Sequence, residues 1–357
     1  MDREPIAAPF RTSRDAALYC FSVALILLLP LGLRAIHAPS HRTRMATAPT
    51  SVGEYTFIQH EVFDETSDLD VVFAGDSIMF NGIDTVEVQK ALSEALGRPA
   101  RVITLGWYWS GDDILYYVLR DLLARRKVAH VVLRLKSEQT RPSLSHPQAY
   151  RWLFGCEHDS VIRTLGLKDS LQAYGIEAIG GPRNLVSLLR PDLLMPAWSG
   201  PTLGHMAVMR QLSGPFRPED VPVPRFPLDT LMVDASNRAQ RLNVVGAPAG
   251  GFQHRYAVGV RDLLHDHGIP VTLLRVPART EVREHTLPVL DEQLSLYASD
   301  TRLVVPDPGQ LFSQVSDPEL DGFYYYDQAH LNRNGARYFT LAVMPALIEI
   351  QRGLRGR

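Results

Sequence analysis

Val-Val-Phe-Ala-Gly-Asp-Ser, residues 71–77, is an apolar run that ends in three turn-forming residues. A short run of this kind, rich in β-branched residues, is typical of a strand buried in a parallel sheet. Ligands of open α/β sheets bind outside the carboxyl ends of the strands. We therefore expect residues 75–77 to lie at the sheet edge where chemistry takes place.

A second segment, residues 326–332, reads Tyr-Asp-Gln-Ala-His-Leu-Asn and lies far away in the chain. A serine hydroxyl becomes a useful nucleophile only with a base in hydrogen-bond reach, and a carboxylate can orient that base. Together the two segments predict Ser77 as nucleophile, His330 as general base and Asp327 as its orienting carboxylate. Each segment alone also has a structural interpretation, because Gly-Asp-Ser favours turns and Asn332 can cap a helix.

The rest of the pattern alternates short apolar runs with segments of helical spacing, which is typical of an α/β fold with a parallel sheet covered on both faces. A proline-rich stretch, residues 137–250, interrupts this rhythm and is predicted to be an insertion. We expect strands at 69–75, 101–105, 131–135, 271–276 and 303–305, and helices at 84–96, 112–126, 281–297 and 333–351.

The N-terminal region contains an uncharged apolar stretch, residues 16–33, that is long enough to cross the hydrocarbon core of a bilayer. No convincing cleavage site follows it, so a retained transmembrane anchor is favoured over a cleaved signal peptide. The predicted organisation is an N-terminal cytoplasmic tail and membrane anchor at 1–36, a linker at 37–60 and an α/β domain at 61–357.

The two segments resemble the conserved blocks of the SGNH (GDSL) hydrolase superfamily. Ser77 in Phe-Ala-Gly-Asp-Ser matches the first block, and Asp327 and His330 in Asp-Gln-Ala-His match the last. Gly106 in Ile-Thr-Leu-Gly-Trp-Tyr stands where the second block carries an oxyanion-hole glycine. The resemblance implies a three-layer α/β sandwich with a parallel, flavodoxin-like sheet, and chemistry that needs no cofactor and no metal.

The resemblance departs from the superfamily at its third block. Where Gly-x-Asn-Asp should follow a strand, this chain has Ser-Glu-Gln at residues 137–139, so the asparagine that donates to the oxyanion is missing. The expected donors are the backbone N–H groups of Ser77 and Gly106, with the side chain of Asn81 as a third candidate beside its alternative role as a turn residue.

The anchor and the resemblance together indicate a function. Membrane-anchored proteins of this superfamily take part in alginate O-acetylation and teichoic-acid D-alanylation. The leading hypothesis is an anchored O-acyltransferase that lies outside the cytoplasm, takes an acylated donor and a glycan acceptor, and works with a multi-spanning membrane acyltransferase. The alternatives are an anchored carbohydrate or lipid esterase and a non-catalytic assembly protein on the same fold.

Aromatic residues at 107–109 and 324–326 would suit stacking on sugar rings, but core and rim packing explains them equally well. The formal net charge of -2 offers no basic excess for phosphate, so no nucleic-acid partner is expected. The chain has only two cysteines, Cys20 and Cys156, which lie far apart and do not indicate a disulfide framework.

Overall fold

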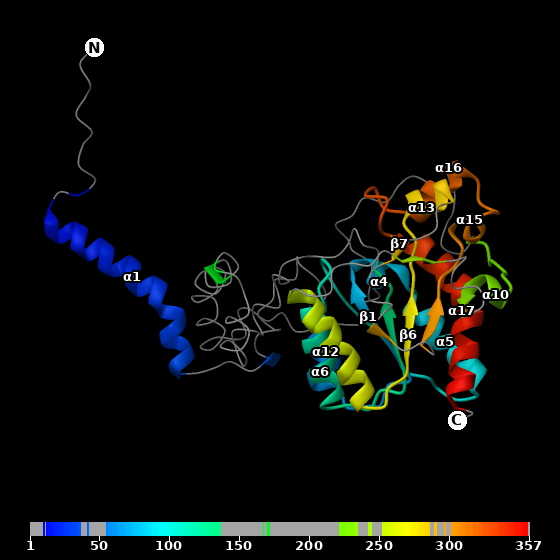
Figure 1. Cartoon of the computed structure of the whole chain (residues 1–357), viewed down its shortest axis with the longest axis horizontal. Helices are drawn as coiled ribbons and strands as arrows, with labels where there is room; N and C mark the ends of the chain where they lie inside the picture. The colour runs from blue at the N-terminus through cyan, green and yellow to red at the C-terminus, as the bar shows by residue number, and fades with distance from the viewer. Residues whose placement is uncertain are drawn as a thin grey trace, which may run out of the picture. The chain divides into compact units, whose positions relative to one another are not determined.

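The computed structural model describes residues 10, 12–36, 41–42, 55–136, 167, 170–171, 221–234, 242–244, 252–285, 289–290, 296–297 and 301–355. The chain divides into two compact units, one made of Met1–Thr47 with Tyr150–Pro196 and the other of Ala48–Ala149 with Ala197–Arg357. The second unit holds an α/β fold whose sheet is mostly parallel and flanked by helices (Figure 1).

The main sheet has six strands in the order β2-β1-β3-β6-β8-β4. Its first five strands run parallel to one another, and β4 pairs antiparallel with β8 at one edge. From β1 the chain passes to β2 on one side and then to β3 on the other, so the strand order reverses at β1. Doubly wound sheets bind their ligands at such a switch point. The strands are β1 (Val71–Asp76), β2 (Val102–Trp107), β3 (Val131–Arg134), β4 (Met232–Val233), β6 (Val271–Leu274) and β8 (Arg302–Val304), with β5 (Asn243–Val244) and β7 (Val289–Leu290) in a separate pair.

Helices cover both faces of the sheet (Figure 1). One face carries α6 (Asp112–Leu123) and α12 (Phe252–Asp266), and the other carries α4 (Ser77–Gly82), α5 (Thr85–Leu96) and α17 (Arg333–Arg355). Shorter helical segments precede the first strand or lie between later elements. They are α3 (Tyr55–Gln59), η2 (His60–Asp64), α10 (Leu228–Leu231), α13 (Arg279–Glu284), α15 (Pro308–Leu311), α16 (Asp317–Leu320) and η6 (Asp321–Phe323).

The boundaries of α5 follow local sequence signals. The Asp84 side chain accepts a hydrogen bond from the backbone N–H of Glu87 at 3.2 Å, and Gly97 ends the helix in the left-handed conformation at φ 66°. An N-cap carboxylate satisfies one of the open N–H groups of a first turn, and glycine adopts positive φ at no steric cost. The helix predicted at 84–96 is thus confirmed, and its ends are set by the N-cap Asp84 and by Gly97.

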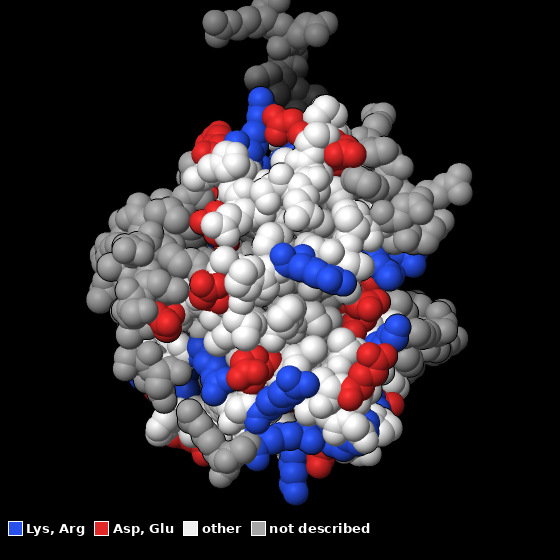
Figure 2. Space-filling model, turned by 90° about the vertical axis from the view of Figure 1, so that its right-hand side faces the viewer, with Lys and Arg blue, Asp and Glu red and all other residues white. Residues whose placement is uncertain are grey.

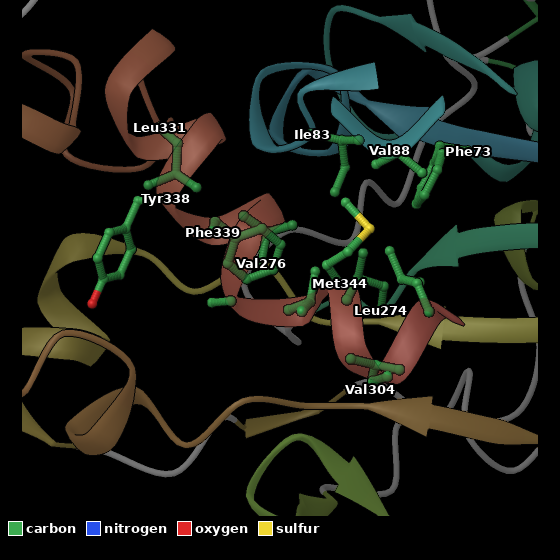
Figure 3. Packing of buried hydrophobic residues seen from close by; sticks show 14 of the residues in the cluster. Phe73, Ile83, Val88, Leu274, Val276, Val304, Leu331, Tyr338, Phe339 and Met344 are labelled. Carbon is green, nitrogen blue, oxygen red and sulfur yellow. The ribbon is translucent and has the colours of Figure 1, made fainter. Parts of the chain in front are cut away.

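The core between the sheet and α17 is apolar and closely packed (Figure 3). Phe339 and Met344 of α17 meet Leu274 and Val304 from two neighbouring strands. Gly335 lets the start of α17 lie close to Phe323, since a side chain at position 335 would collide with the backbone carbonyl of Phe323. The last helix is thereby fixed against the segment that precedes it.

Two expectations differ from the structure. The sixth strand of the sheet, β4, lies within the predicted insertion 137–250. Of that stretch, the structure describes only residues 167, 170–171, 221–234 and 242–244. A two-residue edge strand among prolines has no periodicity to reveal it. The helix predicted at 281–297 is instead the short α13, because His285 takes the left-handed conformation at φ 50° and ends it.

The apolar N-terminal stretch forms α1 (Ser13–Ile36), and its side chains are described as far as Leu29. Large apolar side chains of this helix, such as Phe21 at 66% exposure and Leu25 at 58%, face outward. Within the part of the chain that the structure describes, no helix meets the length and hydropathy that a membrane crossing requires. The anchor at 16–33 therefore stays a prediction.

His130 is a buried, neutral histidine at the amino end of β3. Its Nδ1 lies 2.5 Å from Gln351 Nε2, and its Nε2 lies 2.8 Å from Thr272 Oγ1. An amide nitrogen can only donate, so Nδ1 accepts and the imidazole proton resides on Nε2. Burial, together with the positive charge of Arg302, lowers the pKa of His130 to about 3.

This depressed pKa makes stability depend on pH. Between about pH 6.5 and 3 the unfolded chain binds a proton at His130 that the folded chain does not, so the free energy of unfolding should fall by a few kcal/mol as pH decreases through this window. His130→Gln should flatten that slope in denaturant titrations repeated across pH. The exposed His265→Gln should leave the slope unchanged, and an unaltered slope in His130→Gln would contradict the assignment.

Candidate active site

Ser77 lies where β1 passes directly into α4. Asp76 is the last residue of the strand and the N-cap of the helix, and its Oδ1 accepts a hydrogen bond from the N–H of Ile78 at 3.1 Å. Asp76 pairs in register with Trp107 at the end of β2. The strand-to-helix turn thus places Ser77 as the first helical residue at the carboxyl edge of the sheet, as the sequence predicted.

The structure brings the three predicted catalytic residues together. Ser77 Oγ lies 2.7 Å from His330 Nε2, and His330 Nδ1 lies 2.5 Å from Asp327 Oδ2. An ionised carboxylate can only accept, so Nδ1 carries the imidazole proton and Nε2 is free to accept from the serine hydroxyl. These are the contacts that a nucleophile, a base and an orienting carboxylate need.

The local environment keeps Asp327 ionised. Burial acts to raise the pKa of Asp327, but the hydrogen bond from His330 and the N–H groups of Ala329 and His330 outweigh it and hold the pKa below its usual value. The carboxylate is half-exposed, whereas the imidazole is mostly covered. Asp327 therefore both closes the turn through Oδ1 and holds the imidazole through Oδ2.

The loop that carries His330 is a tight hairpin stabilised from within. The backbone N–H of Tyr325 donates to the carbonyl of His330 at 2.9 Å, and Gln328 turns the chain at φ 60°. Asn332 is fully buried; its Nδ2 donates to the Gly322 carbonyl at 2.8 Å while its Oδ1 accepts from the first N–H groups of α17. The helix-cap interpretation of this segment is thus confirmed, and the cap positions the loop that carries His330; the catalytic interpretation stays a prediction.

The segment after β6 supports the same hairpin. The N–H of Arg279 donates to the carbonyl of Gln328 at 3.0 Å, and the hydroxyl of Tyr324 donates to the carbonyl of Pro277 at 3.2 Å. Arg279 also forms an ion pair with Asp321. The histidine is therefore held from two directions, by α17 and by the start of α13.

A buried ion pair joins Asp76 to Arg134 of β3. Burial acts to raise the pKa of Asp76, but the charges of Arg134 and Lys136 and the N–H of Ile78 lower it below its usual value. Asp76 is thus a buried carboxylate that uses one oxygen for the helix cap and the other for the guanidinium. It fixes the backbone immediately before the nucleophile.

Two further ion pairs occur at the same edge. Lys136 Nζ lies 2.5 Å from Asp112 Oδ1 at the start of α6, and Arg275 pairs with Glu281 of α13. Each pair joins a residue near the carboxyl end of a strand to the beginning of a helix. Buried charges that keep their partners in this way give the edge a defined geometry, because removal of either partner leaves an isolated charge.

The two other predicted oxyanion donors have structural roles here. Gly106 lies within β2, opposite Gly75, and a Cβ at this position would collide with the side chain of Phe80. Asn81 is fully buried, and its Nδ2 donates to the Ser77 carbonyl at 2.7 Å. The close approach of α4 to β2 therefore explains the glycine at position 106. A hydrogen bond within α4 explains Asn81. The oxyanion roles of both residues stay predictions.

Two polar groups that sequence reasoning missed lie at the end of β2 and just after it. Trp107 Nε1 and Ser110 Oγ are buried, and neither has a hydrogen-bond partner. Buried N–H and O–H groups are nearly always paired, so unpaired ones indicate a bound water or ligand. Between them Trp109 adopts φ 60°, a strained conformation of the kind found at functional sites. No sequence motif marks these two groups. Only the pairing of β1 with β2 shows that they lie at the same edge of the sheet as Ser77.

The aromatic residues near the site divide into two classes. Trp107, Tyr324 and Tyr325 are buried in the core, whereas Trp109 and Tyr326 are 58% and 70% exposed. The two exposed rings belong to the loop after β2 and to the histidine hairpin, which both lie at the Ser77 edge. Stacking on a sugar ring therefore stays open for Trp109 and Tyr326, and for the partly exposed Tyr108 between Trp107 and Trp109.

The described residues contain no group of three or more His, Cys, Asp or Glu side chains placed to hold a metal ion. The segment that replaces the third block, residues 137–139, lies outside the described residues, as does most of the predicted insertion.

The Asp76–Arg134 pair should be important for stability. Arg134→Met leaves a buried, unpaired carboxylate and should lower the free energy of unfolding by about 3–5 kcal/mol. The double variant Asp76→Asn/Arg134→Met removes both charges but keeps an amide oxygen for the helix cap, so it should regain much of that loss. Denaturant titration measures both, and a double variant as unstable as Arg134→Met would disprove the charge explanation.

No protein-family model and no curated protein sequence matches this chain. The site itself consists of Ser77, His330 and Asp327 in hydrogen-bond contact at the switch point of the sheet.

Proposed function

We propose that this chain is a serine acyl-transfer enzyme that acts through Ser77, His330 and Asp327. The observation that carries the proposal is the chain of two hydrogen bonds, 2.7 Å and 2.5 Å, from the serine hydroxyl through the imidazole to the carboxylate. The sheet order and the position of Ser77 after β1 support a flavodoxin-like, three-layer SGNH (GDSL) hydrolase fold.

The reaction proceeds in two half-reactions. Ser77 Oγ attacks the acyl carbon of a donor ester while His330 Nε2 takes the hydroxyl proton; the tetrahedral intermediate collapses, and the departing alkoxide receives that proton. In the second half, His330 removes a proton from an acceptor hydroxyl, which attacks the acyl-serine. The serine oxygen leaves, regains the proton from Nε2, and the free enzyme is restored.

The oxyanion requires donors that point at charge developing in the transition state, each worth about 2.7–4 kcal/mol. The Ser77 N–H is one candidate, because it opens α4. The unpaired Trp107 Nε1 and Ser110 Oγ at the neighbouring strand end are further candidates that compensate for the missing third-block asparagine. The N–H of Gly106 and the amide of Asn81 are kept as the sequence-based alternatives.

We propose an O-acyltransferase acting on an exported or cell-surface polysaccharide as the leading activity. Trp109 and Tyr326 are exposed aromatic rings near the site and suit a sugar acceptor. The outward-facing apolar side chains of α1 support a membrane anchor at 16–33, with the catalytic domain outside the cytoplasm and a multi-spanning acyltransferase as partner. The same triad would serve an anchored ester hydrolase, in which water replaces the sugar.

Covalent labelling tests the nucleophile. A fluorophosphonate should label the full-length protein at Ser77, and Ser77→Ala should abolish both labelling and turnover of a chromogenic acetyl ester. His330→Ala should lower turnover at least about 10⁴-fold, and Asp327→Ala should cost less, because it orients the base without exchanging protons.

Ser67→Ala, at an exposed serine away from the triad, is the matched control and should label normally. Absence of labelling in the wild-type protein would instead favour the third alternative, a non-catalytic assembly protein on this fold.

The ratio of acetyl transfer to a sugar acceptor over transfer to water distinguishes the acyltransferase from the esterase. With an acetyl ester as donor and defined oligosaccharides as acceptors, mass spectrometry should show acetyl transfer to sugar outpacing hydrolysis. Trp109→Ala should reduce transfer to sugar several-fold while hydrolysis changes little, since a stacking ring is worth about 1 kcal/mol or more. Hydrolysis that is indifferent to any acceptor would assign the protein to the esterases.

A further inference from the structure

A cavity of about 640 Å³ lies at the edge of the sheet opposite Ser77. It is lined by residues at the amino ends of three strands: His130 before β3, Val271 and Thr272 of β6, and Arg302 of β8. Ser77 follows the carboxyl end of β1 in the same parallel sheet. The two sites are therefore separated by the length of the strands, and the catalytic proposal does not use this cavity.

The described part of the cavity wall combines apolar and polar side chains. Leu264 of α12 and Ile350 of α17 are fully buried there, and the Gly268–Pro270 turn closes one side. His130 forms part of the floor, with both ring nitrogens engaged and the imidazole neutral. Ligand pockets of proteins typically have volumes of about 300–1,000 Å³ and apolar walls with a few placed polar groups, and this cavity fits that description.

Among the described residues, the cavity is lined by two arginines, Arg261 and Arg302, and by one carboxylate, Asp262. Arg261 pairs with its neighbour Asp262. Arg302 is half-buried and has no carboxylate partner among the described residues; its one protein hydrogen bond there is a long one, 3.5 Å, to the carbonyl of Ile350. Gly353 makes room for it, since a Cβ would stand 3.2 Å from Arg302 Nη2. A guanidinium with most of its donors unused thus lines an apolar cavity.

The adjoining cavity, of about 560 Å³, repeats this imbalance. Among its described lining residues, one carboxylate, Asp70, is shared by Arg98 and Arg355. Figure 2 shows Lys and Arg side chains gathered at the lower end of the visible face, the end at which the C-terminus lies in Figure 1. The potential near this edge therefore favours an anion.

The helices limit how much negative charge the site can take. The carboxyl ends of α12 and α17 point to this same edge, and each contributes about half a negative charge. Against the one surplus guanidinium of this cavity, that of Arg302, two such ends leave no large positive excess. That balance fits a ligand with one negative charge better than a dianion such as phosphate.

We propose that the cavity around Arg302 is a binding site for a small amphipathic monoanion, with a carboxylate held by the Arg302 guanidinium and an aliphatic body packed between α12 and α17. The guanidinium can bind a carboxylate through two parallel hydrogen bonds. The apolar walls remove the body of the ligand from water. The site is separate from the serine and needs no chemistry at Ser77.

Photoaffinity labelling tests this site on the full-length protein. The probe is an eight-carbon carboxylic acid with a diazirine in its chain, and mass spectrometry locates the cross-links. We expect cross-links in peptides that contain residues 264–271 and 350–354, competition by octanoate, and at least fivefold weaker labelling by the methyl ester of the probe. Inorganic phosphate should not compete.

Three variants make the test specific. Arg302→Met keeps the length of the side chain but removes its charge, and should reduce labelling at least fivefold; Ile269→Trp fills the cavity and should do the same with Arg302 intact. Arg283→Met, at an exposed arginine of α13, should label like the wild type. Unchanged thermal melting confirms folding of each variant. Cross-links that lie elsewhere, or that persist in a folded Arg302→Met protein, would overturn the proposal.

Discussion

The buried carboxylate of Asp76 is the constraint on which the proposed site depends. One of its oxygens caps α4, and the other is held by Arg134 of the neighbouring strand. The residue therefore joins a strand end, a helix start and a second strand at one point. Ser77 follows it directly, so the direction of the nucleophile is set by a charge that could not be buried without its partner.

The histidine is held by a different kind of interaction. Its hairpin is anchored in the core by Tyr324 and Leu331, and hydrogen bonds from Asn332 and from the start of α13 fix its conformation. Two independent elements thus converge on a 2.7 Å contact between residues that are distant in sequence. A site that must hold such a contact benefits from supports on both partners, since a small displacement would separate nucleophile and base.

The opposite edge of the sheet is organised in another way. At the carboxyl edge, the buried cations Arg134, Lys136 and Arg275 each have their own carboxylate, whereas at the amino edge Arg302 has none among the described residues. The first arrangement gives an electrically balanced edge at the proposed active site. The second leaves an unused charge beside an apolar cavity, which is why a ligand is proposed there.

Local patterns were enough to predict the α/β class, the first strand, helix α5 with both its caps, and the meeting of Ser77, His330 and Asp327, because strand endings and caps are encoded by adjacent residues. They could not reveal β4, which is a two-residue edge strand defined only by its pairing with β8. Nor could they show that Gly106 is required by Phe80, that Asp76 is paired with Arg134, or that Trp107 and Arg302 have unused donors. Those facts depend on contacts between segments far apart in the chain, and only the packing of strands and helices brings such segments together.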